Sequence, residues 1–212
     1  MPAPERRERR EPNRRPEGEA PAEPRDPWTT LSSREVYANP WIRVREDEVL
    51  RPDGSPGIYG VVTTSLAVGV VALTDADEVV LVGQWRYTLD AYSWEIVEGG
   101  ADRDEDGLTA IRRELVEEAG YEADHWERLG HDIAISNSVT DEIARVYLAR
   151  GLRAVPDDPD PTEELQVRLV PFDDAVAMID RGEITDSITS IALLTLDRQR
   201  RSRWRSDGDP GA

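Results

Sequence analysis

Short apolar runs rich in valine mark the centre of the chain and predict buried strands. Residues 66–73 and 79–82 are two such runs. Ahead of them, apolar and charged positions partly alternate over 41–50, and the turn Arg51-Pro-Asp-Gly54 leads into 57–64. Alternation on both sides of turn residues predicts an antiparallel hairpin. Further strands are predicted at 94–97, 133–135, 143–149 and 165–170.

A helical repeat of apolar positions covers 106–119. The residues on its apolar face are Leu108, Ile111, Leu115 and Ala119. Gly120 follows where a left-handed cap would close the helix. Two more helices are predicted, one from Pro171 to Gly182 and one opening at Asp186. Strands that alternate with helices indicate one α/β or α+β domain, preceded by an antiparallel extension.

The length of 212 residues suits one ordinary domain with appendages. Residues 1–26 hold seven arginines, seven acids and almost nothing apolar, which predicts a disordered tail. The expected organisation is then a strand extension at 27–64, a main domain at 65–200 and a flexible tail at 201–212. The arginines of the C-terminal segment suggest either a patch for a polyanion or a solvated helix end, and the second interpretation is favoured.

Composition excludes several kinds of chemistry. The chain has no cysteine, so disulfides, thiolate metal sites and a cysteine nucleophile are excluded. All 26 basic residues are arginine, which excludes a Schiff-base lysine and the lysine of a phosphate-binding loop. The two histidines, His125 and His131, cannot form a histidine-rich metal site and are expected at the surface or in packing.

A net charge of −18 disfavours binding to nucleic acid or to an anionic membrane. It favours a protein that meets phosphates through a bound cation or a few placed arginines. The chain contains no apolar stretch long enough for a membrane helix, and its N-terminus lacks the apolar segment of a signal peptide. A cytoplasmic location is therefore expected.

The segment Gly99–Tyr121 carries the strongest chemical signal. Glu114, Glu117 and Glu118 stand at i, i+3 and i+4, so they share one face of the predicted helix. Their spacing alone leaves two interpretations open. One is a solvated acidic surface, and the other is a carboxylate cluster for hard divalent cations such as Mg²⁺.

The whole segment resembles the Nudix box, G-x5-E-x7-R-E-U-x-E-E-x-G-U, where U is a bulky apolar residue. Eight fixed positions over 22 residues match, and this makes the signal highly specific. They are Gly99, Glu105, Arg113, Glu114, Leu115, Glu117, Glu118 and Gly120. The last position holds Tyr121 in place of an aliphatic residue, and a tyrosine ring can still pack there.

The resemblance implies a Nudix α/β/α sandwich with a mixed sheet, and it implies roles for the box residues. Glu114 and Glu118 would ligate Mg²⁺, or alternatively Mn²⁺, together with the backbone carbonyl of Glu98. Glu117 would be a further metal ligand with a catalytic role. Arg113 would hold the cluster together, and Glu105 would be structural. The implied reaction is hydrolysis of a nucleoside diphosphate linked to another moiety.

Flanking residues are similar to those of the ADP-ribose pyrophosphatase branch. The run Gln84-Trp85-Arg86 precedes Trp94-Glu95-Ile96, so Arg86 and Glu95 would bind substrate. In that branch the N-terminal strands build a homodimer. Two departures keep other sugars open: Ser136–Glu142 lacks the usual Ser-Pro-Gly, and Val97-Glu98 replaces the usual Pro-Ala.

The branch also places a catalytic glutamate on the loop before the last strand. Spacing relative to Leu165 selects Glu163 as the general base, with Glu164 as the alternative. The competing interpretation is an acidic, solvated loop.

The sequence therefore predicts a Mg²⁺-dependent pyrophosphatase of nucleoside diphosphate sugars. ADP-ribose, cleaved to AMP and ribose 5-phosphate, comes first, and GDP-mannose or a broad nucleotide-sugar specificity comes second. Two rivals are a non-catalytic sensor of ADP-ribose-like ligands and a hydrolase of oxidised nucleoside triphosphates. Four aromatic residues suit either a nucleobase or an ordinary core or interface: Trp28, Tyr37, Trp41 and Tyr59.

Overall fold

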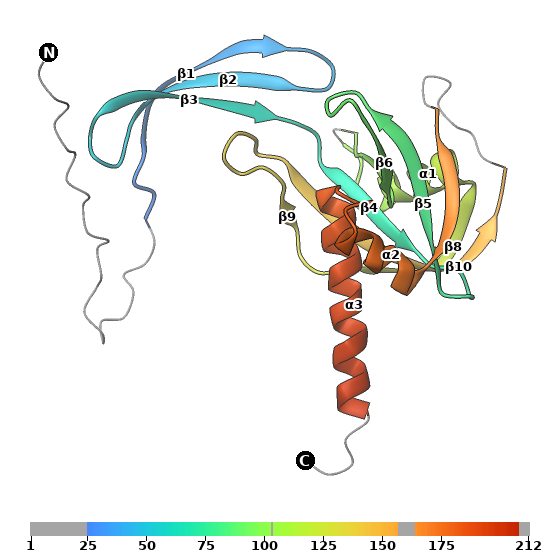
Figure 1. Ribbon diagram of the computed structural model, residues 1–212. Coiled ribbons are helices and arrows are strands. Elements are labelled where there is room, and N and C mark those ends of the chain that lie inside the picture. The colour runs from blue at the N-terminus through green and yellow to red at the C-terminus, as the bar shows by residue number, and fades with distance from the viewer. Residues whose placement is uncertain (1–24, 103, 157–163, 208–212) are drawn as a thin grey trace, which may run out of the picture.

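A computed structural model describes residues 25–102, 104–156 and 164–207. The expected N-terminal hairpin is present, as β2 (Arg43–Leu50) and β3 (Pro56–Thr63) pair antiparallel. Gly54 in their turn adopts a φ of 80°, which glycine tolerates best. A third strand that the pattern did not predict separately, β1 (Thr29–Ala38), pairs antiparallel with β2. The three strands form an arm that extends from the body (Figure 1).

The body contains two sheets. The strands of the first are β4 (Ala67–Ala72), β7 (Val97–Gly100), β8 (Tyr121–Arg128), β9 (Ile133–Ala134) and β10 (Ile143–Ala154). Their order is β7-β4-β10-β8, with β9 also on β10. The sheet is mixed, since β4 and β10 run parallel and the other pairs run antiparallel. The second sheet has the order β11-β5-β6, formed by β5 (Glu78–Arg86), β6 (Ala91–Glu95) and β11 (Gln166–Pro171).

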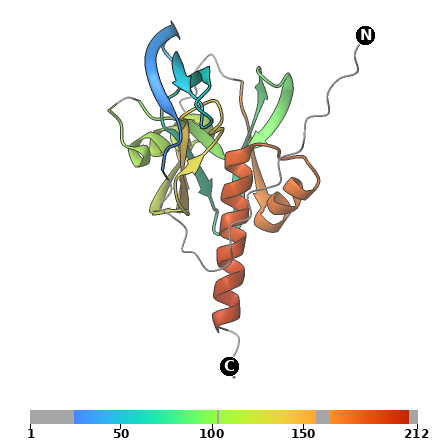
Figure 2. The ribbon, with the colours of Figure 1, turned by 90° about the vertical axis from the view of Figure 1, so that its left-hand side faces the viewer.

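In the described part of the chain, three helices cover these sheets and complete an α/β/α sandwich. They are α1 (Gly107–Ala119), α2 (Phe172–Asp180) and α3 (Ser187–Asp207). α1 and α2 lie on opposite sides of the molecule, as Figure 2 shows. The helices expected from 106, Pro171 and Asp186 are therefore present. α3 continues to Asp207, so the helix passes the predicted boundary at 200.

β4 explains the continuous apolar run of 66–73, because both of its faces are buried. Val68 and Val70 pack in the cluster that contains Ile111 of α1. Val71 points the other way, into the cluster that contains Leu193 of α3. The central strand thus joins the two halves of the core, and it carries β7 as its antiparallel neighbour.

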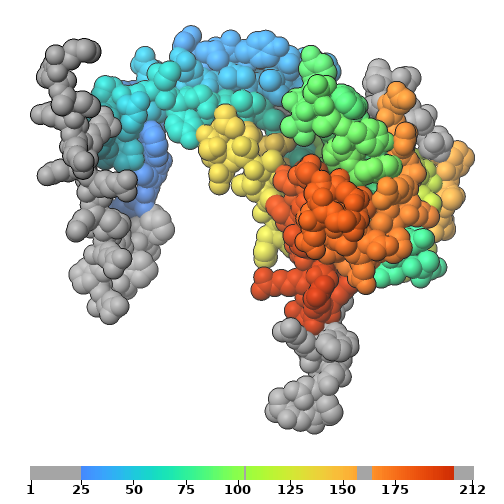
Figure 3. All heavy atoms as spheres, viewed as in Figure 1, coloured from blue at the N-terminus to red at the C-terminus, as the bar shows by residue number. Residues whose placement is uncertain are grey.

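The arm contacts the body through the loop before β10. The backbone N–H of Val62 donates to the carbonyl of Val139 (2.9 Å), and the N–H of Asp141 donates to the carbonyl of Val62 (3.2 Å). The Tyr59 hydroxyl donates to the carbonyl of Ser138 (3.0 Å). The space-filling view shows this segment, in yellow, against the arm (Figure 3). Among the described residues, no helix is long and apolar enough to cross a membrane.

Candidate active site

The caps of α1 fix the position of its acidic residues. The Asp106 carboxylate accepts hydrogen bonds from the backbone N–H of Leu108 (3.0 Å) and of Thr109 (3.2 Å). Gly120 closes the helix in the left-handed conformation, with φ 67°. Ile111 and other apolar residues are buried against the sheet. The helix therefore begins and ends where the pattern predicts, and it presents Glu114, Glu117 and Glu118 on one face.

Arg113 gathers three of the carboxylates. It donates from Nη1 to Glu114 (2.9 Å) and to Glu117 (2.8 Å), and from Nη2 to Glu105 (3.2 Å). The bond to Glu105 is the largest cause that raises the pKa of Arg113 above its ordinary value. The same bond lowers the pKa of Glu105. These charge-assisted bonds hold the acidic face at the end of β7.

Gly99 brings this face against β7. A Cβ atom built on Gly99 would lie 2.3 Å from Cδ of Glu114, so the carboxyl group occupies the space that any side chain would fill. The carbonyl of Glu98 belongs to the peptide bond that leads into Gly99. The Glu114 carboxyl group therefore lies against Gly99, the residue that directly follows the Glu98 carbonyl in the chain.

The donor set is that of a hard cation, with carboxylate oxygens and one carbonyl oxygen. Among residues 25–102, 104–156 and 164–207, no group of three or more histidine, aspartate or glutamate side chains is arranged to hold a metal ion. Glu114 and Glu117 instead bond to Arg113. Each carboxylate has two oxygens and several acceptor sites, so these bonds to Arg113 do not exclude bonds to a cation.

The side chain of Glu98 points to α3. Its carboxyl oxygen accepts a hydrogen bond from the hydroxyl of Thr189 (2.8 Å). Burial raises the pKa of Glu98 well above its ordinary value, and the nearby carboxyl group of Asp186 raises it further. The residue that replaces the usual alanine before Gly99 thus joins β7 to the start of α3.

Arg86 and Glu95, the predicted substrate-binding residues, form an ion pair. Arg86 Nε donates to both carboxyl oxygens of Glu95 (2.9 and 3.1 Å), and its Nη2 donates to one of them. Only 2% of Glu95 is exposed, and its bond chiefly accounts for the raised pKa of Arg86. The pair lines a cavity of about 280 Å³ together with Ser93, Thr185 and Asp186. This cavity lies beside Glu98, since Asp186 contacts both.

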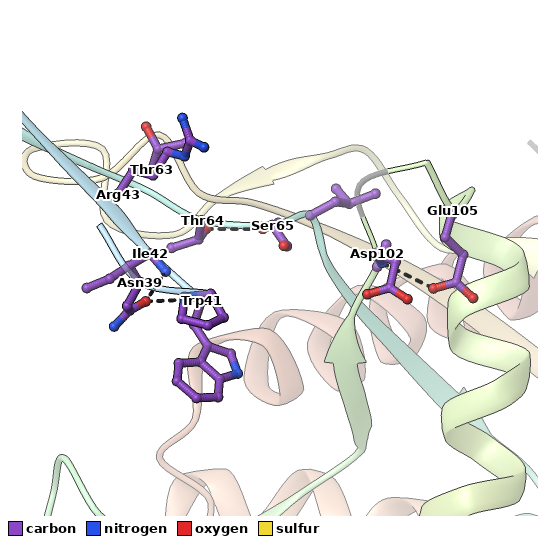
Figure 4. A pocket seen from close by; sticks show the side chains of 12 residues that line it. Asn39, Trp41, Ile42, Arg43, Thr63, Thr64, Ser65, Asp102 and Glu105 are labelled. Atoms are coloured by element: carbon purple, nitrogen blue, oxygen red, sulfur yellow. Dashed lines mark hydrogen bonds between the residues drawn. The ribbon is translucent and has the colours of Figure 1, made fainter. Parts of the chain in front are cut away.

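A larger cleft of about 780 Å³ lies between the arm and the start of α1. Trp41, 77% exposed, lines one side, and Asp102 and Glu105 line the other (Figure 4). An exposed indole that faces a cleft next to the acidic face offers a stacking surface for a planar ring.

The remaining candidates are the predicted general base, the two histidines and Trp28, of which the histidines and Trp28 lie outside these two cavities. Glu163 lies outside the described residues, and the alternative base Glu164 is exposed at the edge of that gap. His125 and His131 are exposed, as expected. Trp28 packs edge-to-face on Tyr59, with ring centroids 5.4 Å apart.

Sequence reasoning missed Asp186 and Thr189 as neighbours of the site. Asp186 was predicted only as a helix start, and Thr189 is a single threonine with no motif around it. Both reach the site because α3 packs on β4 and the Thr189 hydroxyl bonds to Glu98 of β7, and no spacing within the sequence encodes these contacts.

Comparison with known proteins finds similar sequences over most of this chain. Two family models match the chain: the nucleoside diphosphate sugar hydrolase N-terminal domain over residues 28–62 and the NUDIX domain over 63–189. A methanol dehydrogenase activator of Bacillus methanolicus is 31% identical over 172 residues, which cover 80% of this chain and 92% of that protein. An ADP-ribose pyrophosphatase of Mycobacterium tuberculosis is 33% identical over 171 residues, 79% of this chain and 82% of that protein.

The fold also matches a solved structure. The crystal structure of an ADP compounds hydrolase superposes with a TM-score of 0.75 at 20% identity, covering 88% of this chain and 99% of that one. Fold, box and family models agree, and the mixed sheet carries the box helix on one face. The chain therefore belongs to the Nudix family and is a hydrolase of that family, with the N-terminal domain of nucleoside diphosphate sugar hydrolases.

Proposed function

We propose that this Nudix hydrolase splits the pyrophosphate bond of a nucleoside diphosphate sugar, with ADP-ribose as the first candidate substrate. The observation that carries the proposal is the acidic face of α1, held against Gly99 and gathered by Arg113. The matched N-terminal domain and a relative named ADP-ribose pyrophosphatase support this substrate class.

The donor set fits Mg²⁺, with Mn²⁺ as the alternative. Glu114, Glu117, Glu118 and the carbonyl of Glu98 would hold the metal. When bound, a divalent ion neutralises pyrophosphate charge and lowers the pKa of water. The net charge of −18 repels an anionic substrate, and a bound cation would offset this repulsion at the acidic face.

The chain's own residues would bind the substrate and move one proton. Arg86 would bind a phosphate or the sugar, and Glu95 would keep its guanidinium in place. Glu163, or alternatively Glu164, would accept a proton from the attacking water. The water oxygen bonds to one phosphorus, and the bridging P–O bond breaks. The leaving phosphate takes the electron pair, and ADP-ribose yields AMP and ribose 5-phosphate.

GDP-mannose or a broader specificity is the second candidate. The observation that favours it is the segment Ser136–Glu142, which lacks proline and is tied to the arm. The Thr63 hydroxyl donates to Asp141 (2.8 Å), and the Tyr59 hydroxyl donates to the carbonyl of Ser138. A segment fixed in this way would shape the base or sugar pocket.

A homodimer built through the arm is part of the proposal. Every residue of β1 is exposed, and large apolar side chains on the arm face solvent. They are Leu31, Val36, Tyr37, Trp41 and Ile58. Such a surface is typical of a protein interface, and a second copy of this chain is the proposed partner. A cytoplasmic location stays a prediction.

Product analysis by chromatography tests the proposal. The compounds are ADP-ribose, GDP-mannose, UDP-glucose, NADH and 8-oxo-dGTP, each with Mg²⁺, with Mn²⁺ and with EDTA. The expected result is that AMP forms from ADP-ribose when Mg²⁺ or Mn²⁺ is present and does not form with EDTA. Preference for GDP-mannose would favour the second candidate, and preference for 8-oxo-dGTP would favour the triphosphate hydrolase. Absence of any cleavage, with a raised melting temperature in ADP-ribose, would favour the non-catalytic sensor.

A further inference from the structure

Thr189 is a fully buried polar residue in the first turn of α3, with 0% of its surface exposed. Its hydroxyl makes two hydrogen bonds to the short segment where β6 leads into β7. It accepts from the backbone N–H of Ile96 (3.0 Å) and donates to the carboxyl group of Glu98 (2.8 Å). One hydroxyl therefore fixes both the backbone and a side chain of this segment.

The segment that Thr189 binds connects the two parts of the site. Ile96 is the residue between the strands, since β6 ends at Glu95 and β7 begins at Val97. On one side of Ile96 lies the carboxylate that pairs with Arg86. On the other side lies Glu98, whose carbonyl precedes Gly99. A shift of this junction would move the carbonyl relative to Glu114.

The conformation of Thr189 is itself fixed from the helix start. Its backbone N–H donates to the capping carboxylate of Asp186 (2.7 Å). The neighbouring Ile188 and Ile96 both pack closely over Gly69 of β4. A Cβ atom built on Gly69 would lie 3.2 Å from each of these two side chains. Glycine at this position lets α3 approach β4 and Ile96 closely.

We propose that Thr189 is a positioning residue of the active site. Its hydroxyl holds the β6–β7 junction so that the Glu98 carbonyl meets the acidic face of α1 in the geometry a divalent ion needs. The inference rests on the proposed function, because it assigns Thr189 to the cation site named there. Thr189 itself touches neither cation nor substrate.

Removal of the hydroxyl should weaken cation binding while the fold stays intact. Thr189→Val keeps the shape of the side chain but leaves the buried N–H of Ile96 and the carboxyl group of Glu98 without this partner. Because metal sites lose about 10- to 100-fold in affinity when a supporting hydrogen bond is removed, we expect at least a tenfold rise in the Mn²⁺ dissociation constant. Thr189→Ser keeps the hydroxyl and should stay within about twofold of wild type.

The test is Mn²⁺ binding to the full chain without substrate, followed by electron paramagnetic resonance of the free ion. Thr195→Val on the same helix is the control for loss of a threonine hydroxyl. Glu118→Gln tests whether the measured ion occupies the proposed site. Melting temperatures without metal show which variants fold.

The outcomes separate the inference from the proposed function. Weak binding in Thr189→Val, restored in Thr189→Ser and unchanged in Thr195→Val, supports the inference. Wild-type affinity in Thr189→Val, while Glu118→Gln loses binding, overturns the inference and leaves the proposed function standing. Equal binding by wild type and Glu118→Gln, or absence of binding by wild type, contradicts the proposed cation site instead and overturns the inference with it.

Amide hydrogen exchange keeps the inference testable if Thr189→Val does not fold. In the wild type, Mn²⁺ should slow exchange in residues 94–99 and 186–190 together, since the hydroxyl joins them. Slowed exchange in both segments supports the inference, and slowed exchange in 94–99 alone overturns it.

Discussion

The position of Glu114 depends on the absence of a side chain at Gly99. The carboxyl group occupies the volume that a Cβ atom would take, at a separation far below van der Waals contact. Gly100, the next residue, has nothing within 4 Å of its own ideal Cβ. The two adjacent glycines therefore differ in their role. A Cβ atom at position 99 would overlap Glu114, whereas one at position 100 would meet nothing.

Gly99→Ala should displace Glu114 and weaken both metal binding and turnover, by about tenfold or more. The overlap should also lower the free energy of unfolding by about 1–3 kcal/mol. Gly100→Ala is the matched control, and we expect near wild-type values for it. The measurements are Mn²⁺ affinity, turnover and urea unfolding. Equal behaviour of the two variants would contradict this role for Gly99.

Asp132 supplies a pH-dependent contribution to stability. Hydrogen bonds from Arg145 and Arg128 lower its pKa from 3.8 to about 2. A folded-state pKa below the unfolded value stabilises the fold above the unfolded value, and this contribution is lost as pH falls through the folded value. Asp132→Asn should therefore lower the melting temperature at neutral pH, and its difference from wild type should shrink as pH falls from about 5 towards 2.

The exposed Asp75→Asn is the control for this titration. Melting curves of wild type and both variants across the pH range give the comparison. A difference between Asp132→Asn and wild type that stays constant down to the lowest pH would refute the assignment.

At the scale of elements, α3 is anchored to the body beyond its buried face. Arg200 donates to both carboxyl oxygens of Asp77 (2.7 and 2.8 Å). Its guanidinium also lies 3.8 Å from the ring centroid of Phe172, at the start of α2. This arginine thus has a structural role, which neither interpretation of the basic segment predicted.

Arg200→Met should lower the free energy of unfolding by about 1 kcal/mol, since it removes a half-exposed ion pair and a cation–π contact. Arg198→Met, at an exposed position of the same helix, should change stability little. Urea unfolding of both variants gives the measurement. Loss of stability in Arg198→Met alone would be inconsistent with this anchor.

The elements that the sequence predicted are those with an apolar face in the core. α1 and the strands β4 and β5 bury such faces, and their patterns are clear. β1 was not predicted separately. All its residues are exposed, so neither face has to be apolar and the sequence shows no alternation of apolar and polar residues. β8 was missed because it is the edge strand and mostly exposed. The end of α3 was assigned to a tail because this stretch of the sequence has no apolar face.

The same division holds for the site. Glu114, Glu117 and Glu118 were predictable because helical spacing places them together within one element. Glu114 lies against Gly99, and the resemblance to the box already implied that this residue and the carbonyl before Gly99 share a site. The contact of Thr189 with Ile96, across 93 positions, depends on packing between distant elements. Local patterns carry no information on this second contact.

At the scale of the whole molecule, the arm leaves apolar side chains in solvent that a second copy would cover. Ile58 is 66% exposed on β3. We expect the full chain to have twice its 23.8 kDa mass in light scattering. Ile58→Glu should shift the mass towards that of one chain, because a charge would be buried in the interface.

Leu194→Glu, an exposed aliphatic position on α3, is the control and should leave the mass unchanged. A wild-type mass of one chain at micromolar concentration would contradict the dimer. So would a dimer that Ile58→Glu leaves intact while Leu194→Glu dissociates it, since the interface would then lie on α3.

The acidic face of α1 is proposed to support cleavage of ADP-ribose. The most direct measurement is the rate of AMP formation from ADP-ribose with Mg²⁺, for wild type and Glu118→Gln side by side, with the exposed Glu127→Gln as control. We expect AMP and ribose 5-phosphate in equal amounts from wild type and Glu127→Gln, and at least about a hundredfold slower reaction in a folded Glu118→Gln. Equal rates in wild type and Glu118→Gln, or no AMP from wild type with Mg²⁺, would contradict this role of the acidic face.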